Sequence, residues 1–288
     1  MGGMVKKFFQ ASMTPEFDLD LIPQLLKSQH PISFMLIFIG TGIWDEMDIS
    51  LRGLEAAKNA DEVYAEFYTS KPATNAKKLS KLLGKEVRVL ERSDLEENSI
   101  EIVKKAREID IAILIPGDPM IATTHTAIRV QAKQNGVETK IIHSSSIISA
   151  VCGITGLHNY RFGKSATISY PYGVISSFPA ETVKINQKIN AHTLLFLDLH
   201  PKPMKIDEAI SILEKSDREL LNLFAVGIAR AGSEGCVVKC DRLKNLKKFE
   251  FGPPMHVLVI LAPKIHITEF EYLKEFASAP SELEAIVE

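Results

Sequence analysis

The sequence predicts an α/β protein with two domains. From residue 35 to the C-terminus, short apolar segments of strand length alternate with amphipathic segments of helix length, a pattern typical of largely parallel sheets covered by helices. The chain has 288 residues, enough for roughly two domains of about 150 residues each. Residues 153–163 show no clear period and contain three glycines. We therefore expect a first α/β domain over residues 35–150 and a second over 151–288.

Residues 1–34 form an N-terminal extension in this interpretation. Apolar residues between Phe17 and Leu26 have the spacing of one short amphipathic helix that begins after Pro15. Acidic residues follow Phe8-Phe9 closely, so no secretory apolar core develops. Three alternatives stay open: the extension docks onto the domains, it is disordered, or translation begins at Met35.

Five apolar segments predict the strands of the first domain, at residues 36–39, 63–66, 86–90, 111–115 and 139–143. Amphipathic segments between them predict helices over residues 50–59, 73–83, 97–109 and 123–135. The residues spaced for the buried face of the first helix are Leu51, Leu54, Ala57 and Lys58. Gly136 follows the last helix and is expected to end it.

A second set of segments predicts the second domain. Its strands are expected at residues 166–169, 193–198, 223–229, 236–240 and 256–262, with helices at 181–189 and 207–215. The apolar runs are far shorter than the 18 to 20 or so residues that span a membrane. No membrane segment is therefore expected.

Composition narrows the function classes. Lys and Arg number 34 and Asp and Glu number 36, a formal charge of −2. This balance disfavours proteins that bind nucleic acid through phosphate contacts, because those usually carry a basic excess. Three cysteines are too few for a disulfide framework and predict a reducing cytoplasm. Cys236 and Cys240 are expected to be core thiols on one strand face rather than a redox or metal pair.

Two glycine motifs resemble nucleotide-binding loops incompletely. Gly40-Thr41-Gly42 lies between a predicted strand and a helix, but a dinucleotide fingerprint needs a third glycine where this chain has Asp45. Gly163-Lys164-Ser165 matches the end of a P-loop, but His158 stands in place of the first glycine and a strand follows. The histidines lack the spacing of a metal site, so no metal is expected.

Gly117-Asp118-Pro119 is more informative because it ends the most apolar predicted strand of the first domain. Open parallel sheets bind ligands at the carboxyl ends of their strands. The glycine lets a ligand approach the backbone closely, Asp118 can accept hydrogen bonds, and the proline fixes the turn. This loop is therefore a candidate binding site.

The loops share a family pattern when they are read together. Its parts lie at residues 40–50, 65–70, 116–125 (which ends in Ala-Thr-Thr-His), 143–147, 153–157, 160–167, 195–198, 229–233 and 253–258. The pattern resembles the tetrapyrrole-methylase superfamily, and within it the members that form diphthine. It covers residue 35 to the C-terminus. The chain departs from the usual family residues at Thr41, Trp44 and Ser50, and Met255 separates Pro254 from His256.

The resemblance implies a methyltransferase that uses S-adenosyl-L-methionine and releases S-adenosyl-L-homocysteine. It implies two unlike α/β domains of the tetrapyrrole-methylase type, with the cofactor in the interdomain cleft, and a homodimer. The residues expected to contact the cofactor by resemblance are Ile43, Asp118, Ile121, Ser146, Ile147, Leu197, Ala231 and His256. Those expected to shape the loops are Gly40, Gly42 and Gly117.

The acceptor implied by the resemblance is the amino group of a modified histidine on translation elongation factor 2, in diphthamide biosynthesis. No general base can be named. Methylation of a tetrapyrrole or of ribosomal RNA stays open as an alternative, as does a nucleotide-dependent oxidoreductase, against which Asp45 argues. The near-neutral charge favours a folded protein over RNA as the acceptor. A further alternative is a binding module without catalytic activity, which would require that the protein bind no such cofactor.

Overall fold

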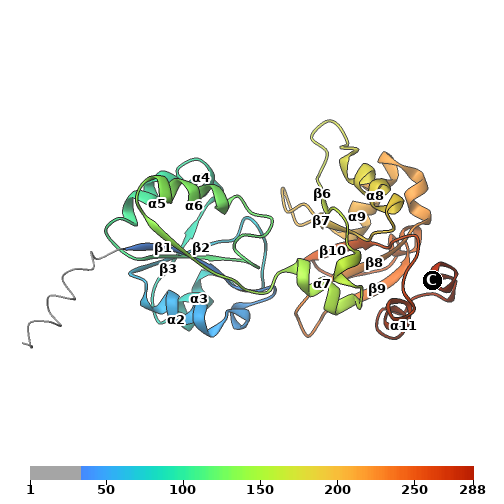
Figure 1. The fold of residues 1–288 in the computed structure, drawn as a ribbon, viewed down its shortest axis with the longest axis horizontal. Helices are drawn as coiled ribbons and strands as arrows, with labels where there is room; N and C mark the ends of the chain where they lie inside the picture. Colours follow the sequence, from blue (N-terminus) through green and yellow to red (C-terminus); the bar gives the residue numbers. More distant parts are fainter. Residues whose placement is uncertain (1–33) are drawn as a thin grey trace, which may run out of the picture.

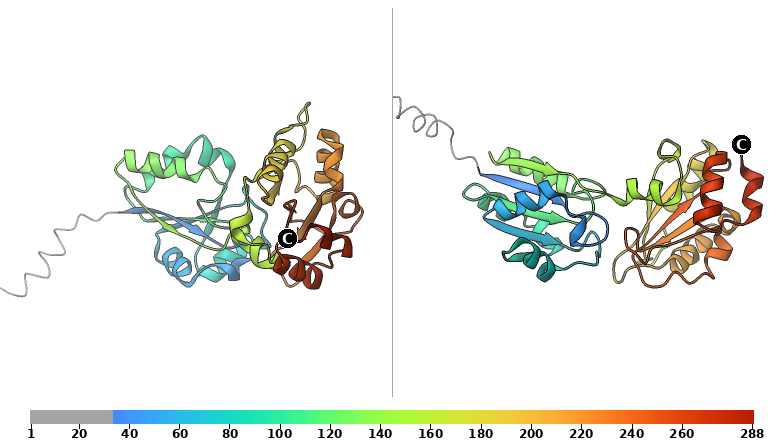
Figure 2. Two further views of the ribbon diagram at one scale, coloured as in Figure 1. Left: turned by 45° about the vertical axis from the view of Figure 1, so that its right-hand side comes forward. Right: turned by 90° about the horizontal axis from the view of Figure 1, so that it is seen from below.

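The computed structural model describes residues 34–288 and consists of two α/β domains (Figures 1 and 2). The strands of the first domain are β1 (Met35–Gly40), β2 (Glu62–Glu66), β3 (Val87–Leu90), β4 (Ile111–Ile115) and β5 (Glu138–Ile142). Its helices are α2 (Leu51–Asn59), α3 (Ala76–Leu83), α4 (Arg92–Glu96), α5 (Ser99–Lys105) and α6 (His125–Gln134), with the 3-10 helix η1 (Glu46–Asp48). The predicted α/β fold class is confirmed.

The first sheet is fully parallel, with the strand order β3-β2-β4-β1-β5. Helices α2 and α3 cover one face and α4, α5 and α6 cover the other (Figure 1). The central strands β1 and β4 are apolar throughout because both of their faces are buried: in β1, Phe38 packs toward α5 and α6, and Ile39 packs toward α2 and α3. The edge strands β3 and β5 carry exposed residues such as Arg88 and Glu138.

The neighbouring strands β1 and β4 form a topological switch point. The chain leaves β1 toward α2 on one face and leaves β4 toward α6 on the other. Their carboxyl-terminal loops therefore diverge and leave a crevice at this edge of the sheet, which is where such folds bind ligands.

The second domain contains strands β6 (Ala166–Ile168), β7 (Thr193–Leu197), β8 (Phe224–Ala229), β9 (Val237–Arg242) and β10 (His256–Ile260). Their order is β6-β7-β10-β8-β9. The pair β6 and β7 is parallel, whereas the other three pairs are antiparallel. The two domains are therefore unlike, as expected.

Helices cover both faces of the second sheet (Figure 1). The first face carries α8 (Phe178–Lys188), α9 (Ile206–Ser216) and α10 (Leu243–Leu246), through Val183, Ile210 and Leu243. The second face carries α7 (Ile147–Thr155), α11 (Ile267–Phe276) and the 3-10 helix η4 (Ser281–Ile286). The 3-10 helices η2 (Asn159–Arg161) and η3 (Arg218–Asn222) connect other elements. The segment between β5 and α7 runs from one domain to the other (Figure 2).

Several predicted helices have different bounds in the structure. The helix expected over residues 97–109 is replaced by α4 and α5, which Asn98 separates with φ −112° and ψ 17°. Helix α3 begins only at Ala76, because the side chain of Asn75 caps it. In α2 the expectations for Leu51 and Lys58 were wrong: Leu51 is 86% exposed and Lys58 is exposed too, and the buried residues are Gly53 and Ala57.

Other segments gained helices that the pattern did not predict. Residues 153–155, for which no periodic pattern was found in the sequence, form the C-terminal end of helix α7. Helix α11 was not predicted, because the buried Glu269 interrupts the apolar pattern of its inner face. The N-terminal extension, with its predicted short helix, lies outside the described residues except for residue 34.

Candidate active site

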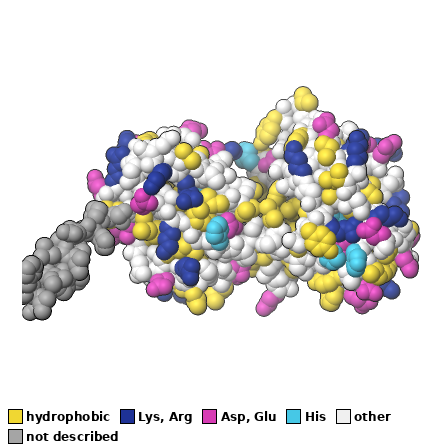
Figure 3. All heavy atoms as spheres, in the orientation of Figure 1, with side chains coloured by type: hydrophobic (Ala, Val, Ile, Leu, Met, Phe, Trp, Pro, Cys, Tyr) yellow, Lys and Arg dark blue, Asp and Glu magenta, His cyan; other side chains and the backbone are white. Residues whose placement is uncertain are grey.

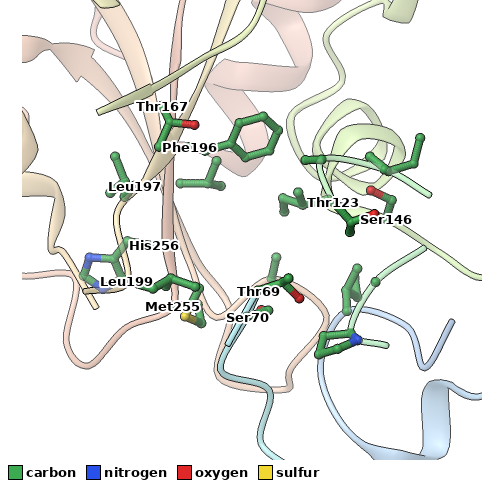
Figure 4. A pocket seen from close by; sticks show the side chains of 18 of the residues that line it. Thr69, Ser70, Thr123, Ser146, Thr167, Phe196, Leu197, Leu199, Met255 and His256 are labelled. Atoms are coloured by element: carbon green, nitrogen blue, oxygen red, sulfur yellow. The ribbon is translucent and has the colours of Figure 1, made fainter. Parts of the chain in front are cut away.

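A cavity of about 370 Å³ lies between the two domains. Loops at the carboxyl ends of β1, β2 and β4 and the start of α7 form the wall on the side of the first domain. The ends of β7 and β8 and the start of β10 form the opposite wall. Figure 3 shows hydrophobic side chains gathered in this hollow. In Figure 4, Thr167 and Phe196 face Thr123 and Ser146 across the space.

The structure brings all eight predicted cofactor residues to this one cavity. They are Ile43, Asp118, Ile121, Ser146, Ile147, Leu197, Ala231 and His256. Gly42 and Gly117 also line it, whereas Gly40 lies just beneath, where an added Cβ would be 2.5 Å from the carbonyl oxygen of Gly117. The contact of these residues with a cofactor stays a prediction.

Glycine is required where the loops after β1 and β4 meet. Gly42 pairs with Gly117 in an isolated bridge, in which the Gly117 amide donates to the Gly42 carbonyl at 2.7 Å. Gly42 has a φ of +82°, and a Cβ there would lie 2.2 Å from the Cβ of Asp48. Any larger residue at Gly42 would collide with Asp48 of the same loop and disturb the bridge to Gly117.

Asp48 fixes the loop that follows Gly42. Its Oδ2 accepts hydrogen bonds from the backbone amides of Ile43 at 3.1 Å and Trp44 at 2.7 Å. These contacts place Ile43 on the cavity wall. The nearby Asp45, which argued against a dinucleotide fingerprint, caps η1 by accepting from the Met47 amide.

Asp118 joins the ends of β4 and β5. Its Oδ1 accepts from the Met120 amide at 3.0 Å, and its Oδ2 accepts from His143 Nδ1 at 2.7 Å and from the Ser144 amide at 3.4 Å. The carboxylate is 7% exposed. Ser146 lies two residues after Ser144, and its side chain caps α7 by accepting a hydrogen bond from the Ile148 amide. This contact fixes the start of α7 in the cavity wall.

His256 is the buried histidine of the wall on the side of the second domain. Its Nδ1 accepts from the Ile206 amide at 3.2 Å, so Nε2 carries the proton and donates to the Pro253 carbonyl at 3.1 Å. Burial lowers the pKa of His256. The ring is therefore neutral at pH 7 and offers the cavity an uncharged surface.

Sequence reasoning did not assign a site role to the wall formed after β2 and at the start of α4. The residues there that line the cavity are Tyr68, Thr69, Ser70 and Arg92. Glu66 ends β2, is fully buried, and accepts from the amides of Tyr68 at 2.9 Å and Thr69 at 3.0 Å. Burial raises the pKa of Glu66. The motif at residues 65–70 and the carboxyl-end rule were the signals that could have found this wall.

The incomplete P-loop has a structural role. Gly163 and Lys164 precede β6, and the side chain of Asn186 accepts from the Lys164 amide at 3.1 Å. Among residues 34–288, no helix is long and apolar enough to cross a membrane. Cys236 and Cys240 both pack in the core on the α7 and α11 face, as free thiols.

Comparisons with known proteins agree with this architecture. Residues 35–247 match the model of the Tetrapyrrole (Corrin/Porphyrin) Methylases. The chain is 56% identical over 253 residues to the diphthine synthase of Archaeoglobus fulgidus, covering 88% of this chain and 100% of that one. It is 47% identical over 263 residues to the diphthine synthase of Methanosarcina mazei, covering 86% and 98%. A crystal structure of diphthine synthase superposes with a TM-score of 0.86 at 56% identity, over 88% of this chain and 100% of that one. The chain therefore belongs to the diphthine synthases of the tetrapyrrole (corrin/porphyrin) methylase family.

Proposed function

We propose that this chain is an S-adenosyl-L-methionine-dependent methyltransferase that methylates the amino group of the modified histidine of translation elongation factor 2 to form diphthine. The observation that carries the proposal is the 56% identity to a diphthine synthase over its entire length. The relatives named above do not favour the tetrapyrrole, ribosomal RNA or oxidoreductase alternatives.

The cavity suits the proposed cofactor in size and in chemistry. Its volume of about 370 Å³ lies within the range of small-molecule sites, roughly 300–1,000 Å³. Gly117 has a φ of +71°, and a Cβ there would meet no atom within 4 Å, so the wall leaves room beside the backbone. Apolar residues such as Ile43, Ile147 and Leu197 suit an adenosyl group and a methylene chain.

When bound in this cavity, S-adenosyl-L-methionine would supply a sulfonium methyl group for in-line transfer to an amine lone pair, with S-adenosyl-L-homocysteine as the leaving group. The residues of this chain then contribute by holding the reacting groups in place. Asp48 and Asp118 hold the loops after β1 and β4 in one arrangement, and the apolar wall limits access of water. Fixing two reactants at near-attack distance can lower the barrier by about 7 to 11 kcal/mol at best. We assign no general base.

The proposed partner is a folded protein. The formal charge of −2 supports recognition by surface shape rather than by attraction to phosphates. We infer that loops of the second domain recognise elongation factor 2. We also infer, from the resemblance, a homodimer in the cytoplasm. Light scattering tests the dimer and should give twice the 32.0 kDa of the chain.

Two measurements test the proposed function. Mass spectrometry of the purified protein should detect S-adenosyl-L-homocysteine or its precursor carried through purification. Incubation with cofactor labelled in the methyl group should transfer label to elongation factor 2 with the unmethylated modification, and not to a tetrapyrrole or ribosomal RNA. Transfer to either of the latter and not to the factor would overturn the proposal.

A further inference from the structure

One part of the cavity wall is separate from the predicted cofactor residues. It consists of Tyr68, Thr69 and Ser70, which follow β2, and Arg92, which begins α4. These residues follow β2 and β3, whereas the predicted cofactor residues of the first domain follow β1, β4 and β5. This wall, called here the β2 wall, is available to a second molecule in the same cavity.

Most charged side chains of the cavity are already bonded to the backbone. Both oxygens of Asp118 accept amide hydrogen bonds. Asp198 accepts from the amides of Leu199 at 2.8 Å, His200 at 3.1 Å and Tyr170 at 3.0 Å. The guanidinium of Arg230 donates to three carbonyl oxygens, those of residues 235, 251 and 253. These contacts hold loops of the cavity wall in place, and Nη2 of Arg230, on the wall of the second domain, has no hydrogen-bond partner among residues 34–288.

Arg92 differs from these residues. Its Nε donates to Glu96 Oε2 at 2.7 Å, and among residues 34–288 neither terminal nitrogen of its guanidinium has a hydrogen-bond partner. Its side chain is 72% exposed. Glu96 is in turn bonded through Oε1 to the hydroxyl of Thr124 at 3.4 Å. The guanidinium is thus held at one edge while its two outer nitrogens stay available.

A second polar group of the β2 wall is also available. The hydroxyl of Ser70 has no hydrogen-bond partner among the described residues, whereas that of the neighbouring Thr69 is bonded to Glu66. Tyr68 is the aromatic member of this wall, and burial raises its pKa to about 12. Arg92 is therefore the cation of the β2 wall, beside neutral groups.

We propose that Arg92 binds a carboxylate carried by the methyl acceptor and so sets the acceptor amine in the cavity. The inference rests on the proposed function, since it concerns the acceptor of that reaction. Guanidinium presents parallel N–H donors that match the two oxygens of a carboxylate. A carboxylate near the acceptor amine would thus fix the direction of its lone pair. His200 also lines the cavity, but it comes from the opposite domain.

The test compares Arg92→Gln and Arg92→Lys with the control Arg88→Gln. Arg88 lies on β3 in the same domain and pairs with glutamates, but it does not line the cavity. Rates of methyl transfer to elongation factor 2 give KM and kcat, and calorimetry gives the affinity for S-adenosyl-L-homocysteine. Loss of a charge-assisted hydrogen bond should raise the KM for the factor about 10- to 100-fold in Arg92→Gln. Arg92→Lys should recover part of this, with cofactor affinity unchanged in both.

Two results would overturn the role of Arg92. One is an unchanged KM in Arg92→Gln, and the other is a weaker affinity for S-adenosyl-L-homocysteine, which would place Arg92 at the cofactor. Binding of the factor to the enzyme loaded with S-adenosyl-L-homocysteine, measured without turnover, should show the same loss. This binding measurement separates the role of Arg92 from the proposed function. An enzyme that binds the factor through Arg92 but methylates nothing would contradict only the proposed function.

Discussion

His143 Nδ1 donates a hydrogen bond to Asp118 Oδ2 over 2.7 Å. The bond connects the loop after β4 with the end of β5, on either side of β1. Asp118 is buried while the side chain of His143 is 71% exposed. Asp118 thus acts as the fixed point for three donors that belong to two loops, and both loops continue into the cavity wall at Ile121 and Ser146.

Replacement of Asp118 by alanine should weaken cofactor binding. The variant leaves the amides of Met120 and Ser144 and the ring of His143 without their acceptor, so both loops lose their arrangement. Titration calorimetry with S-adenosyl-L-homocysteine should show a loss of about tenfold or more. Glu138→Gln, which alters an exposed pair with Lys133 outside the cavity, is the control. Unchanged affinity in Asp118→Ala would remove this residue from the site.

Replacement of Gly40 by alanine should also weaken cofactor binding. The added Cβ would lie 2.5 Å from the Gly117 carbonyl oxygen and 2.7 Å from the Cβ of Ser144. Overpacking of this kind costs about 1–3 kcal/mol and moves two loops of the wall. Gly136→Ala is a matched control, since φ +74° with no atom within 4 Å makes it strained by about 1–2 kcal/mol far from the cavity. Both variants should lower the unfolding temperature. A similar drop in cofactor affinity for both would contradict the specific role of Gly40.

The central strands β1 and β4 were predictable because burial on both faces makes them apolar over their whole length. Strand β4, Ile-Ala-Ile-Leu-Ile, has every residue buried, and its bounds agree with the prediction. The helices were less predictable, because their ends depend on local contacts. Asn75 begins α3 three residues late, and the backbone at Asn98 divides one expected helix into two. Such caps and breaks have weak signals in periodicity.

The candidate site was predictable where the family pattern names a residue at the end of a strand. The β2 wall was missed, although the motif at residues 65–70 belongs to the pattern, because its chemistry depends on tertiary contacts. Burial of Glu66 turns that carboxylate into an internal acceptor for Tyr68 and Thr69. The position of Arg92 at the cavity depends on packing of α4 over the sheet. Neither contact has a sequence period.

Acid should destabilise the second domain through Glu269. This carboxylate is fully buried, and burial alone would raise its pKa. Hydrogen bonds from His192 Nε2 at 3.2 Å and from the amides of His158 at 2.8 Å and His266 at 2.9 Å outweigh burial and lower the pKa to about 2. A carboxylate whose pKa is lowered in the folded state stabilises the fold at pH values above its ordinary pKa of 4.5. This stability, on the order of 2 kcal/mol, is lost as the pH falls from about 4.5 toward 2.

The variant Glu269→Gln isolates this contribution. Urea unfolding at pH 7 should give a free energy of unfolding lower than that of the unmodified chain, because an amide cannot accept from all three donors. At pH 3 the difference between the two proteins should shrink, since part of the stabilisation by Glu269 has already been lost there. Other carboxylates titrate equally in both proteins and cancel in the comparison. An equal difference at both pH values would contradict the lowered pKa.

Cys240 should react with thiol reagents only after unfolding. Burial raises its pKa to about 12, with a further contribution from Asp241, and the side chain is 0% exposed. The thiolate is the reactive form, so the native state offers the reagent neither access nor charge. Cys152 and Cys236 are half-buried, and burial raises their pKa values too, so both should react slowly but measurably. Mass spectrometry of protein labelled in native buffer and in urea should find Cys240 modified only in urea. The variant Cys240→Ala should leave native labelling unchanged, and native labelling of Cys240 at the rate of Cys236 would contradict its place in the core.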